Sequence, residues 1–302
     1  MPSIDPYTIL QGPAIITFLG ATFYSEGDIE VEEVIEEMTI KASGLNDIED
    51  RVKDRMYKVK FKPAGEWENL TVLFPNYAIG GHLFDSNPLI IWTREGADNK
   101  RTYYNAAITK LPSVATGVDN TMLGDIEFTC LIHPEAESGD AGYMQVATET
   151  FPAETFDPAA VLTPVINFSL GSDTPWTNIS TITAPVFDFA LNVRPVKVSG
   201  RGTVSMILTS KKGTVKFTPV GVTEAAVRAL RGADQAMGTR PPVKDVTAYG
   251  TGIFIKLNKC QFKGGNLNYG VTKERIGEIT GQATQTVTSG TADPLWIVDT
   301  SD

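Results

Sequence analysis

Short stretches of alternating hydrophobic and polar residues recur along most of this chain, and such alternation is typical of β-strands. Residues 57–61 place three hydrophobic side chains on one face and two lysines on the other, and residues 203–209 alternate similarly. Further short runs of strand type lie at 15–19, 186–191, 88–92, 102–104, 107–111, 125–132, 252–257, 260–262 and 276–282. The sequence therefore predicts a mainly β protein.

Two short helices interrupt the strands. Trp67, Leu70 and Phe74 have the i, i+3, i+7 spacing of an apolar helical stripe. Later in the chain, Thr223 is a suitable N-cap and Gly232 stands where a helix commonly ends. We expect each helix to cover one face of a sheet.

The chain also repeats itself. The run Val59-Lys60-Phe61-Lys62-Pro63-Ala64-Gly65 returns 156 positions later as Val215-Lys216-Phe217-Thr218-Pro219-Val220-Gly221. In both places a strand ends at a proline, turns at a glycine and gives way to a helical pattern. Two further matches, of 127–129 with 278–280 and of 138–141 with 289–292, lie 151 positions apart. The sequence thus predicts a duplicated fold.

The repeat suggests domain limits. We expect a first domain at 1–150 and a second at 184–302, the two copies opening with the strands at 15–19 and 186–191. Residues 151–183 are rich in Pro, Thr, Ser and Asp without a sustained period, which predicts a linker or an extended arm.

Each copy is expected to contain a long hairpin. In the second copy, residues 203–209, the run Lys211-Lys212-Gly213 and residues 214–217 predict two strands joined by a Gly-containing turn. In the first copy, residues 29–41 have helical spacing but also alternate. Because the duplicate predicts a hairpin, we favour a strand with a bulge near Glu32 and Glu33.

Composition and charge limit the class of protein. With 302 residues, 42% hydrophobic and 21% charged, the chain is typical of a globular protein of about two domains. No run approaches the ~20 apolar residues of a membrane span, and residues 1–5 resemble no secretory signal, so we expect synthesis in the cytosol. The first 151 residues carry 11 Lys and Arg against 24 Asp and Glu, whereas the rest carry 15 against 12. This asymmetry favours contacts between unlike halves, or reflects drift after duplication.

No motif in the sequence indicates catalysis. Gly-rich phosphate loops, nucleophile elbows and paired metal ligands are all missing from the sequence. Cys130 and Cys260 are expected to be reduced, and His82 and His133 belong to no spaced ligand set. The carboxylates between Glu30 and Asp54 are interpreted as a solvated face. We therefore expect neither an enzyme nor a cofactor.

The order of elements resembles a known family. A long hairpin, the run Arg51-Val52-Lys53-Asp54-Arg55, the strand at 57–61 and the helix opened by Gly65-Glu66-Trp67-Glu68-Asn69-Leu70 resemble the tail tube (major tail) protein of tailed bacteriophages. The tandem arrangement is similar to the siphophage type, in which two tube domains are fused. The resemblance implies two tandem tail-tube-like β-sandwich or barrel domains, each with one short helix and a long hairpin.

The resemblance also implies a function. Members of this family form stacked rings with a continuous inner β-barrel, and three tandem chains make one pseudo-hexameric ring. The implied partners are further copies of the chain, a tape measure protein in the lumen, double-stranded DNA in transit, and tail terminator and tip proteins. The implied location is the virion tail. Residues expected to line the lumen are Glu30, Glu32 and Glu37 on the first hairpin and Ser199, Thr203 and Ser205 on the second.

Two interpretations of the surface residues remain open. Glutamates facing a lumen would repel phosphates, but Lys58 and Lys60 would offset glutamates on neighbouring strands. A different class of function is a monomeric, two-domain β-sandwich that binds glycans, with Trp92, Tyr103 and Tyr104 as its ligand platform.

Overall fold

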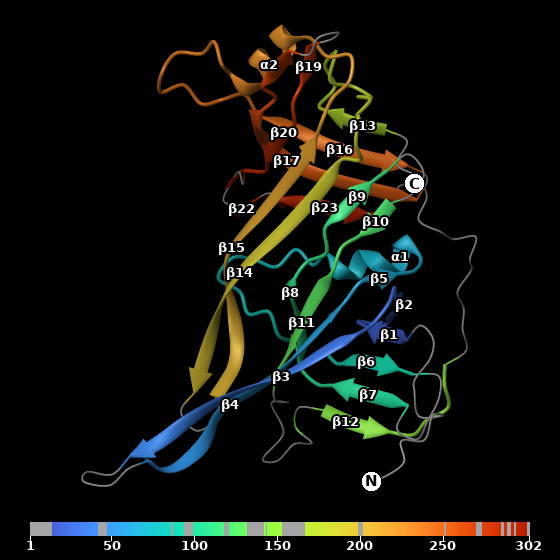
Figure 1. Ribbon diagram of the computed structural model, residues 1–302, viewed down its shortest axis with the longest axis vertical. Coiled ribbons are helices and arrows are strands. Elements are labelled where there is room, and N and C mark those ends of the chain that lie inside the picture. The colour runs from blue at the N-terminus through green and yellow to red at the C-terminus, as the bar shows by residue number, and fades with distance from the viewer. Residues whose placement is uncertain are drawn as a thin grey trace.

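The computed structural model describes residues 14–41, 47–85, 87–93, 99–117, 121–131, 142, 144–152, 167–198, 202–250, 252–269, 274–284, 287–288, 291–292 and 294–300. They form an elongated, mainly β molecule with two short α-helices, which confirms the predicted fold class. We call residues 14–152 the first unit and residues 167–300 the second unit. The first unit occupies the lower part of Figure 1 and most of the second unit the upper part.

The first unit contains twelve described strands and one short helix followed by a 3-10 turn. These elements are β1 (Ile15–Phe18), β2 (Ala21–Ser25), β3 (Glu30–Lys41), β4 (Asp47–Phe61), β5 (Pro63–Ala64), α1 (Trp67–Leu70), η2 (Thr71–Leu73), β6 (Leu89–Trp92), β7 (Lys100–Tyr103), β8 (Ala106–Lys110), β9 (Val114–Thr116), β10 (Thr121–Leu123), β11 (Ile126–Cys130) and β12 (Met144–Ala147).

The second unit has eleven described strands and one helix. They are β13 (Asn167–Leu170), β14 (Val186–Val198), β15 (Gly202–Phe217), α2 (Glu224–Arg231), β16 (Lys244–Gly250), β17 (Ile253–Gly264), β18 (Leu267–Tyr269), β19 (Glu274–Ile276), β20 (Ile279–Gln282), β21 (Val287–Thr288), β22 (Thr291–Ala292) and β23 (Trp296–Asp299).

Two sheets pack face to face in the first unit. One has the strand order β3-β4-β11-β8, and the other the order β12-β7-β6-β1-β2-β5. Phe18 of β1 meets Phe128 of β11 edge to face, with ring centroids 4.9 Å apart, and Tyr57 of β4 meets Tyr103 of β7 at 5.7 Å. Because alternate residues of each strand enter this layer, the polar residues between them remain on the outer faces.

The second unit has the same strand order. Its sheet β14-β15-β20-β17 corresponds to β3-β4-β11-β8, and its set β23-β17-β16-β13 corresponds to β12-β7-β6-β1. Strand β17 belongs to both sets and contains Lys259, whose φ is 48°. The equivalent position of the first unit is Asn105, which lies between β7 and β8 and has φ 46°. The two units therefore share one topology.

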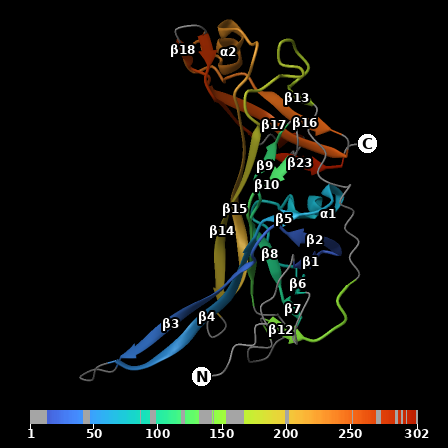
Figure 2. The ribbon, with the colours of Figure 1, turned by 45° about the vertical axis from the view of Figure 1, so that its right-hand side comes forward.

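The register of the long hairpins is also the same. The pairing register shifts at two places in both β3–β4 and β14–β15. The first shift lies between Glu36 and Glu37 in the first unit and between Asn192 and Val193 in the second. The second shift lies between Ile40 and Lys41 in the first unit and 156 positions later in the second. Figure 2 shows the β3–β4 hairpin reaching away from the body of the molecule. Because a bulge increases local twist, matched bulges give the two hairpins matched curvature.

The structure decides between the two interpretations of residues 29–41. Residues 30–41 form strand β3, and every residue of β3 has a partner on β4, so the helical spacing was misleading. The bulge is not at Glu32 and Glu33, which pair regularly with Lys58 and Tyr57. The extra residues are on β4: Lys53 at the first shift and Ile48 at the second. Cross-strand packing has overridden local helix propensity here.

The predicted hairpin at 203–217 is wrong. These residues form one continuous strand, β15, which pairs with β14 along its length. Gly213 is no turn residue, because it is buried in β15 opposite Phe189. A Cβ atom built there would lie 2.8 Å from Leu257 Cδ2, so glycine is needed for close packing.

The segment predicted to be a linker or an extended arm contains a strand. Residues 151–183 contain β13, which pairs with β16 as β1 pairs with β6. The counterpart of β1 is therefore β13 and not the strand at 186–191. Ile126 pairs with Phe61, and Ile279 pairs with Phe217, the counterpart of Phe61. Ile126 and Ile279 are therefore equivalent, which displaces the predicted match of 127–129 with 278–280 by two residues. Residues 138–141 lie outside the described part of the chain.

Both helices are confirmed. In α1 and the turn after it, Trp67, Leu70 and Phe74 are buried. In α2, the Thr223 hydroxyl accepts a hydrogen bond from the Ala226 amide at 3.3 Å, as expected of an N-cap.

Candidate functional site: the joint between the units and its charged face

The two units are joined by strand addition. Strand β9 leaves the first unit and pairs with the edge of β14, with Val114 opposite Phe187 and Ala115 opposite Val186. The Thr116 amide donates to the Pro185 carbonyl at 2.8 Å. Because β9 also pairs with β10, this short hairpin extends the sheet of the second unit by two strands.

A loop of the first unit closes the other edge of the long hairpin. The Gly80 amide donates to the Leu208 carbonyl at 2.8 Å, and the Leu83 amide donates to the Met206 carbonyl at 3.1 Å. Leu83, Met206 and Leu208 are buried there together with Ala107. Backbone pairing and apolar burial therefore act together at this edge.

The end of the β14–β15 hairpin rests on the bulge of the first hairpin. Asp54 beside this bulge is only 5% exposed, and its Oδ1 accepts a hydrogen bond from the Thr203 amide at 2.8 Å. The Thr203 hydroxyl donates to Asp54 Oδ2, and Lys197 Nζ lies 3.3 Å from the same oxygen. A buried carboxylate with two donors and a cation is well compensated for its loss of water.

Glu36 completes this contact from the neighbouring strand. Its carboxylate pairs with Lys197 of the second unit and with Lys53 of the bulge, the latter at 2.7 Å. Hydrogen bonds from Lys197 first and Lys53 second lower the pKa of Glu36 to about 2. Glu36 therefore stays ionised in mild acid.

Aromatic rings continue across the joint. The Phe74 ring lies 5.4 Å from that of Phe189, which in turn lies 5.4 Å from Trp296. Trp67 Nε1 of the first unit donates to the Asp299 carbonyl at 2.8 Å. The main hydrophobic core is therefore continuous through both units.

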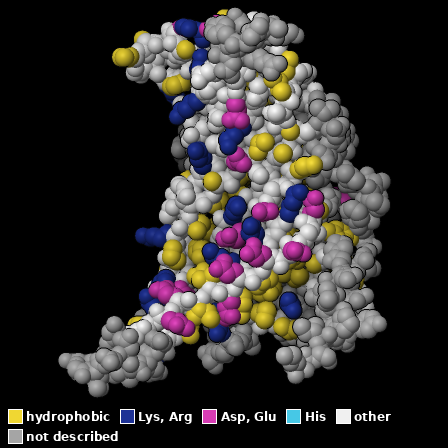
Figure 3. Space-filling view, viewed as in Figure 1, with side chains coloured by type: hydrophobic (Ala, Val, Ile, Leu, Met, Phe, Trp, Pro, Cys, Tyr) yellow, Lys and Arg dark blue, Asp and Glu magenta, His cyan; other side chains and the backbone are white. Residues whose placement is uncertain are grey.

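The outer face of the sheet β3-β4-β11-β8 carries a row of charges of alternating sign. The row runs across the strands through Glu30, Lys60, Glu127 and Lys110. Lys60 Nζ lies 3.8 Å from Glu30 Oε2 and 3.5 Å from Asp125 Oδ2. Figure 3 shows acidic and basic side chains intermingled along the middle of the molecule. Lysines on neighbouring strands therefore offset the glutamates, which was one of the two interpretations left open.

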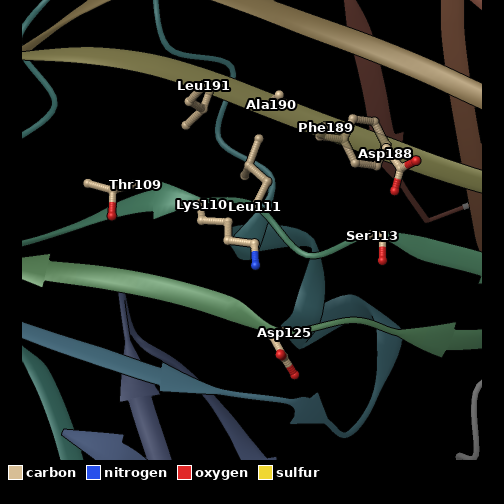
Figure 4. A pocket seen from close by; sticks show the side chains of 9 residues that line it. All are labelled: Thr109, Lys110, Leu111, Ser113, Asp125, Asp188, Phe189, Ala190 and Leu191. Carbon is tan, nitrogen blue, oxygen red and sulfur yellow. The ribbon is translucent and has the colours of Figure 1, made fainter. Parts of the chain in front are cut away.

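An open cavity of about 520 Å³ follows the seam between β8 and β14. Lys110 and Asp125 line it from the first unit and Asp188 from the second, as Figure 4 shows. Lys216 lies 3.7 Å from Asp188, so this charge is also paired. The seam prolongs the mixed-charge face into the second unit.

The structure separates the residues that we expected to line a lumen. Glu30 and Glu32 lie on the charged face and are exposed. Glu37 projects from the opposite face, because its position along the regularly alternating strand β3 differs by an odd number of residues from the positions of Glu30 and Glu32. Thr203 is 1% exposed and bound to Asp54, so it is not available to a lumen. Ser205 Oγ lies 2.8 Å from His82 Nδ1, and Ser199 falls outside the described residues.

The expected glycan platform is not assembled. Tyr103 is 1% exposed in the core, whereas Lys100 Nζ lies 5.0 Å from the centre of the Trp92 ring. Tyr104 donates its hydroxyl to Gln145 Oε1. The three rings therefore do not form one exposed surface.

The described residues form neither a metal-ligand cluster nor a membrane-spanning helix. Within the described ranges, no three His, Cys, Asp or Glu side chains gather as metal ligands would. No helix in the described part of the chain is long and apolar enough to span a membrane.

No family model matches this chain, and no curated protein matches it either.

Sequence reasoning missed the residues that hold the joint together. Asp54 was interpreted as part of a solvated carboxylate face but is buried, Lys197 was not singled out, and Thr203 was expected to line a lumen. The only signal in the sequence was the duplication. It relates Lys197 to Lys41 and Ser210 to Asp54, because the residues of each pair lie 156 positions apart.

Proposed function

We propose that this chain is the building block of a bacteriophage tail tube. Three copies form a ring with pseudo-six-fold symmetry, and rings stack into a tube through which DNA passes into the host. The proposal joins the family resemblance of the sequence to the duplicated topology.

The observation that supports it most is the strand addition of β9 to β14. It joins two copies of one topology head to tail, and such a contact generates a ring when its rotation closes. Ring closure also removes sheet edges that would otherwise remain unpaired.

The charged face suits a surface that DNA slides past. Tight binding of DNA comes from lysines and arginines that release counterions from the phosphates. On this face Lys60 is next to Glu30 and Asp125, and Lys216 is next to Asp188. Paired charges of both signs leave little net attraction for a phosphate backbone.

The remaining parts of the proposal follow from the resemblance. The protein acts as a structural component and not as an enzyme. Its partners are other copies of itself, a tape measure protein during assembly, and the terminator and tip proteins at the two ends of the tube. Its location is the tail of the virion.

Assembly is tested with purified protein over a range of concentrations. Light scattering after size-exclusion chromatography should report trimers or larger species, and negative-stain electron microscopy should show rings or tubes with an axial bore. A particle with the mass of one chain at the highest soluble concentration would refute the proposal.

The role of the charged face is tested on the assembled tubes. The variant Glu30→Gln/Glu32→Gln removes the β3 carboxylates opposite Lys58 and Lys60 and makes the face more positive, so its tubes should gain DNA binding that weakens with salt. The matched control is Glu37→Gln on the opposite face, which should behave like wild type. Tight DNA binding by wild-type tubes would contradict a sliding surface.

A further inference from the structure

The joint inside the chain has two parts that occur twice in the sequence. The donor is a short hairpin, β9–β10, and the acceptor is the edge strand β14 of a long hairpin. Because the units share one topology, each unit must contain both parts. Within the ranges that the structure describes, only one donor and one acceptor are used.

The second copy of the donor is the hairpin β18–β19. Val114 pairs with Leu123 in β9–β10, and 153 positions later Leu267 pairs with Ile276 in β18–β19. The other two pairs of each hairpin have the same offset. Among the strands that the structure describes, β18 and β19 pair only with each other.

The second copy of the acceptor is strand β3. Glu30 pairs with Lys60 as Val186 pairs with Lys216, so Glu30 and Val31 correspond to Val186 and Phe187. Strand β3 lies at the end of its sheet, and within the described ranges β4 is its only partner. Its outer edge is thus free to accept a strand.

Hydrophobic residues of the β3–β4 hairpin whose counterparts are buried in the internal joint are exposed. Val31, Ile35 and Val52 are 39%, 41% and 56% exposed. Their counterparts, 156 positions later, are Phe187, Leu191 and Leu208. Phe187 and Leu208 are fully buried, and Leu191 packs against the core. The second-unit residues are covered by the joint, whereas nothing in the described part of the chain covers their first-unit counterparts to the same extent.

We propose that a second copy of this chain covers this surface by repeating the internal joint. Strand β18 of one copy adds to the edge of β3 of the next, with Leu267 opposite Val31 and Asn268 opposite Glu30. The acidic first half of one chain then meets the basic second half of another. This inference rests on the self-assembly in the proposed function, but not on the passage of DNA.

Disulfide trapping tests the register. Cα atoms of opposed residues in antiparallel strands are about 4.5–5.5 Å apart, within reach of a disulfide. The variant Asn268→Cys/Glu30→Cys should therefore form covalent multimers under mild oxidation. Cys130 and Cys260 are buried, and burial raises the pKa of each thiol, so the native cysteines should stay unreactive.

Two matched variants control this experiment. Ala115→Cys/Val186→Cys occupies the corresponding positions of the internal joint and should give a cross-linked single chain, which shows that the chain is folded. Asn268→Cys/Glu33→Cys places the second thiol on the other face of β3, about 10 Å along the strand, and should give no multimers. Multimers from both Asn268 pairs in equal amount would overturn the register.

A surface substitution tests the contact without cysteines. Val52→Asp should abolish assembly and leave the melting temperature of the monomer unchanged, because Val52 is exposed in the single chain. Val220→Asp, at a residue 49% exposed outside this surface, should assemble as wild type does.

The outcomes separate this inference from the proposed function. If wild-type protein forms rings but Asn268→Cys/Glu30→Cys does not cross-link and Val52→Asp still assembles, the interface is wrong while the proposed function stands. If wild-type protein never assembles, both are refuted.

Discussion

Asp54 is the residue whose loss we expect to weaken the joint most. Replacement by alanine leaves the amide and hydroxyl of Thr203 buried without an acceptor, because Thr203 is 1% exposed. Each buried donor left unsatisfied costs about 1–3 kcal/mol. The carboxylate itself no longer has to be desolvated, which offsets part of that cost. We therefore expect Asp54→Ala to lower the free energy of unfolding by about 2–4 kcal/mol.

Urea unfolding, followed by tryptophan fluorescence at a concentration where the chain is monomeric, measures this loss. Ser210→Ala is the matched control, because Ser210 is exposed and is the counterpart of Asp54 in the β14–β15 hairpin. Its cost should stay below ~0.5 kcal/mol. Asp54→Asn keeps one acceptor for the Thr203 amide and should fall between the two. If Asp54→Ala and Ser210→Ala lower the free energy of unfolding by the same amount, the assigned role of the Asp54 contact is wrong.

Three further predictions concern acid stability, packing and capping. Because Glu36 has a pKa of about 2 in the folded chain against 4.5 ordinarily, its stabilising effect is complete above pH 4.5 and is lost as the pH falls toward 2. Melting temperatures between pH 5 and pH 2 should fall more steeply for wild type than for Glu36→Gln, and parallel curves would contradict this. Gly213→Ala should cost about 1–3 kcal/mol, because its Cβ would crowd Leu257, and an unchanged urea midpoint would disprove the packing argument. Thr223→Ala removes the N-cap of α2 and should cost about 1 kcal/mol, whereas Thr223→Ser should restore most of it in the same assay.

The duplication was the most informative property of the sequence, and it had a physical basis. Strand, proline, glycine and helix follow one another twice, because each element needs particular residues at particular places. The repeat of Val59-Lys60-Phe61 at Val215-Lys216-Phe217 therefore located the end of the long hairpin in both units. The helices α1 and α2 followed from their apolar spacing and, for α2, its N-cap.

Strand partners were harder to predict. Alternation reports which residues are buried, but it does not say which strand lies beside another. Gly213 illustrates the limit, because the same residue suits a turn and a close contact between packed layers. The sequence alone could not show that Leu257 occupies the space where a side chain would project.

The amino-acid sequence by itself determined the β-rich class, the doubled unit, the two helices and the uneven charge of the halves, since all of these depend on local residue preferences. Only the tertiary structure decided the single long strand β15, the bulge at Lys53, and the contact of Asp54 with Thr203. These features arise between residues far apart in the chain, where packing and hydrogen bonding across the joint outweigh local propensity.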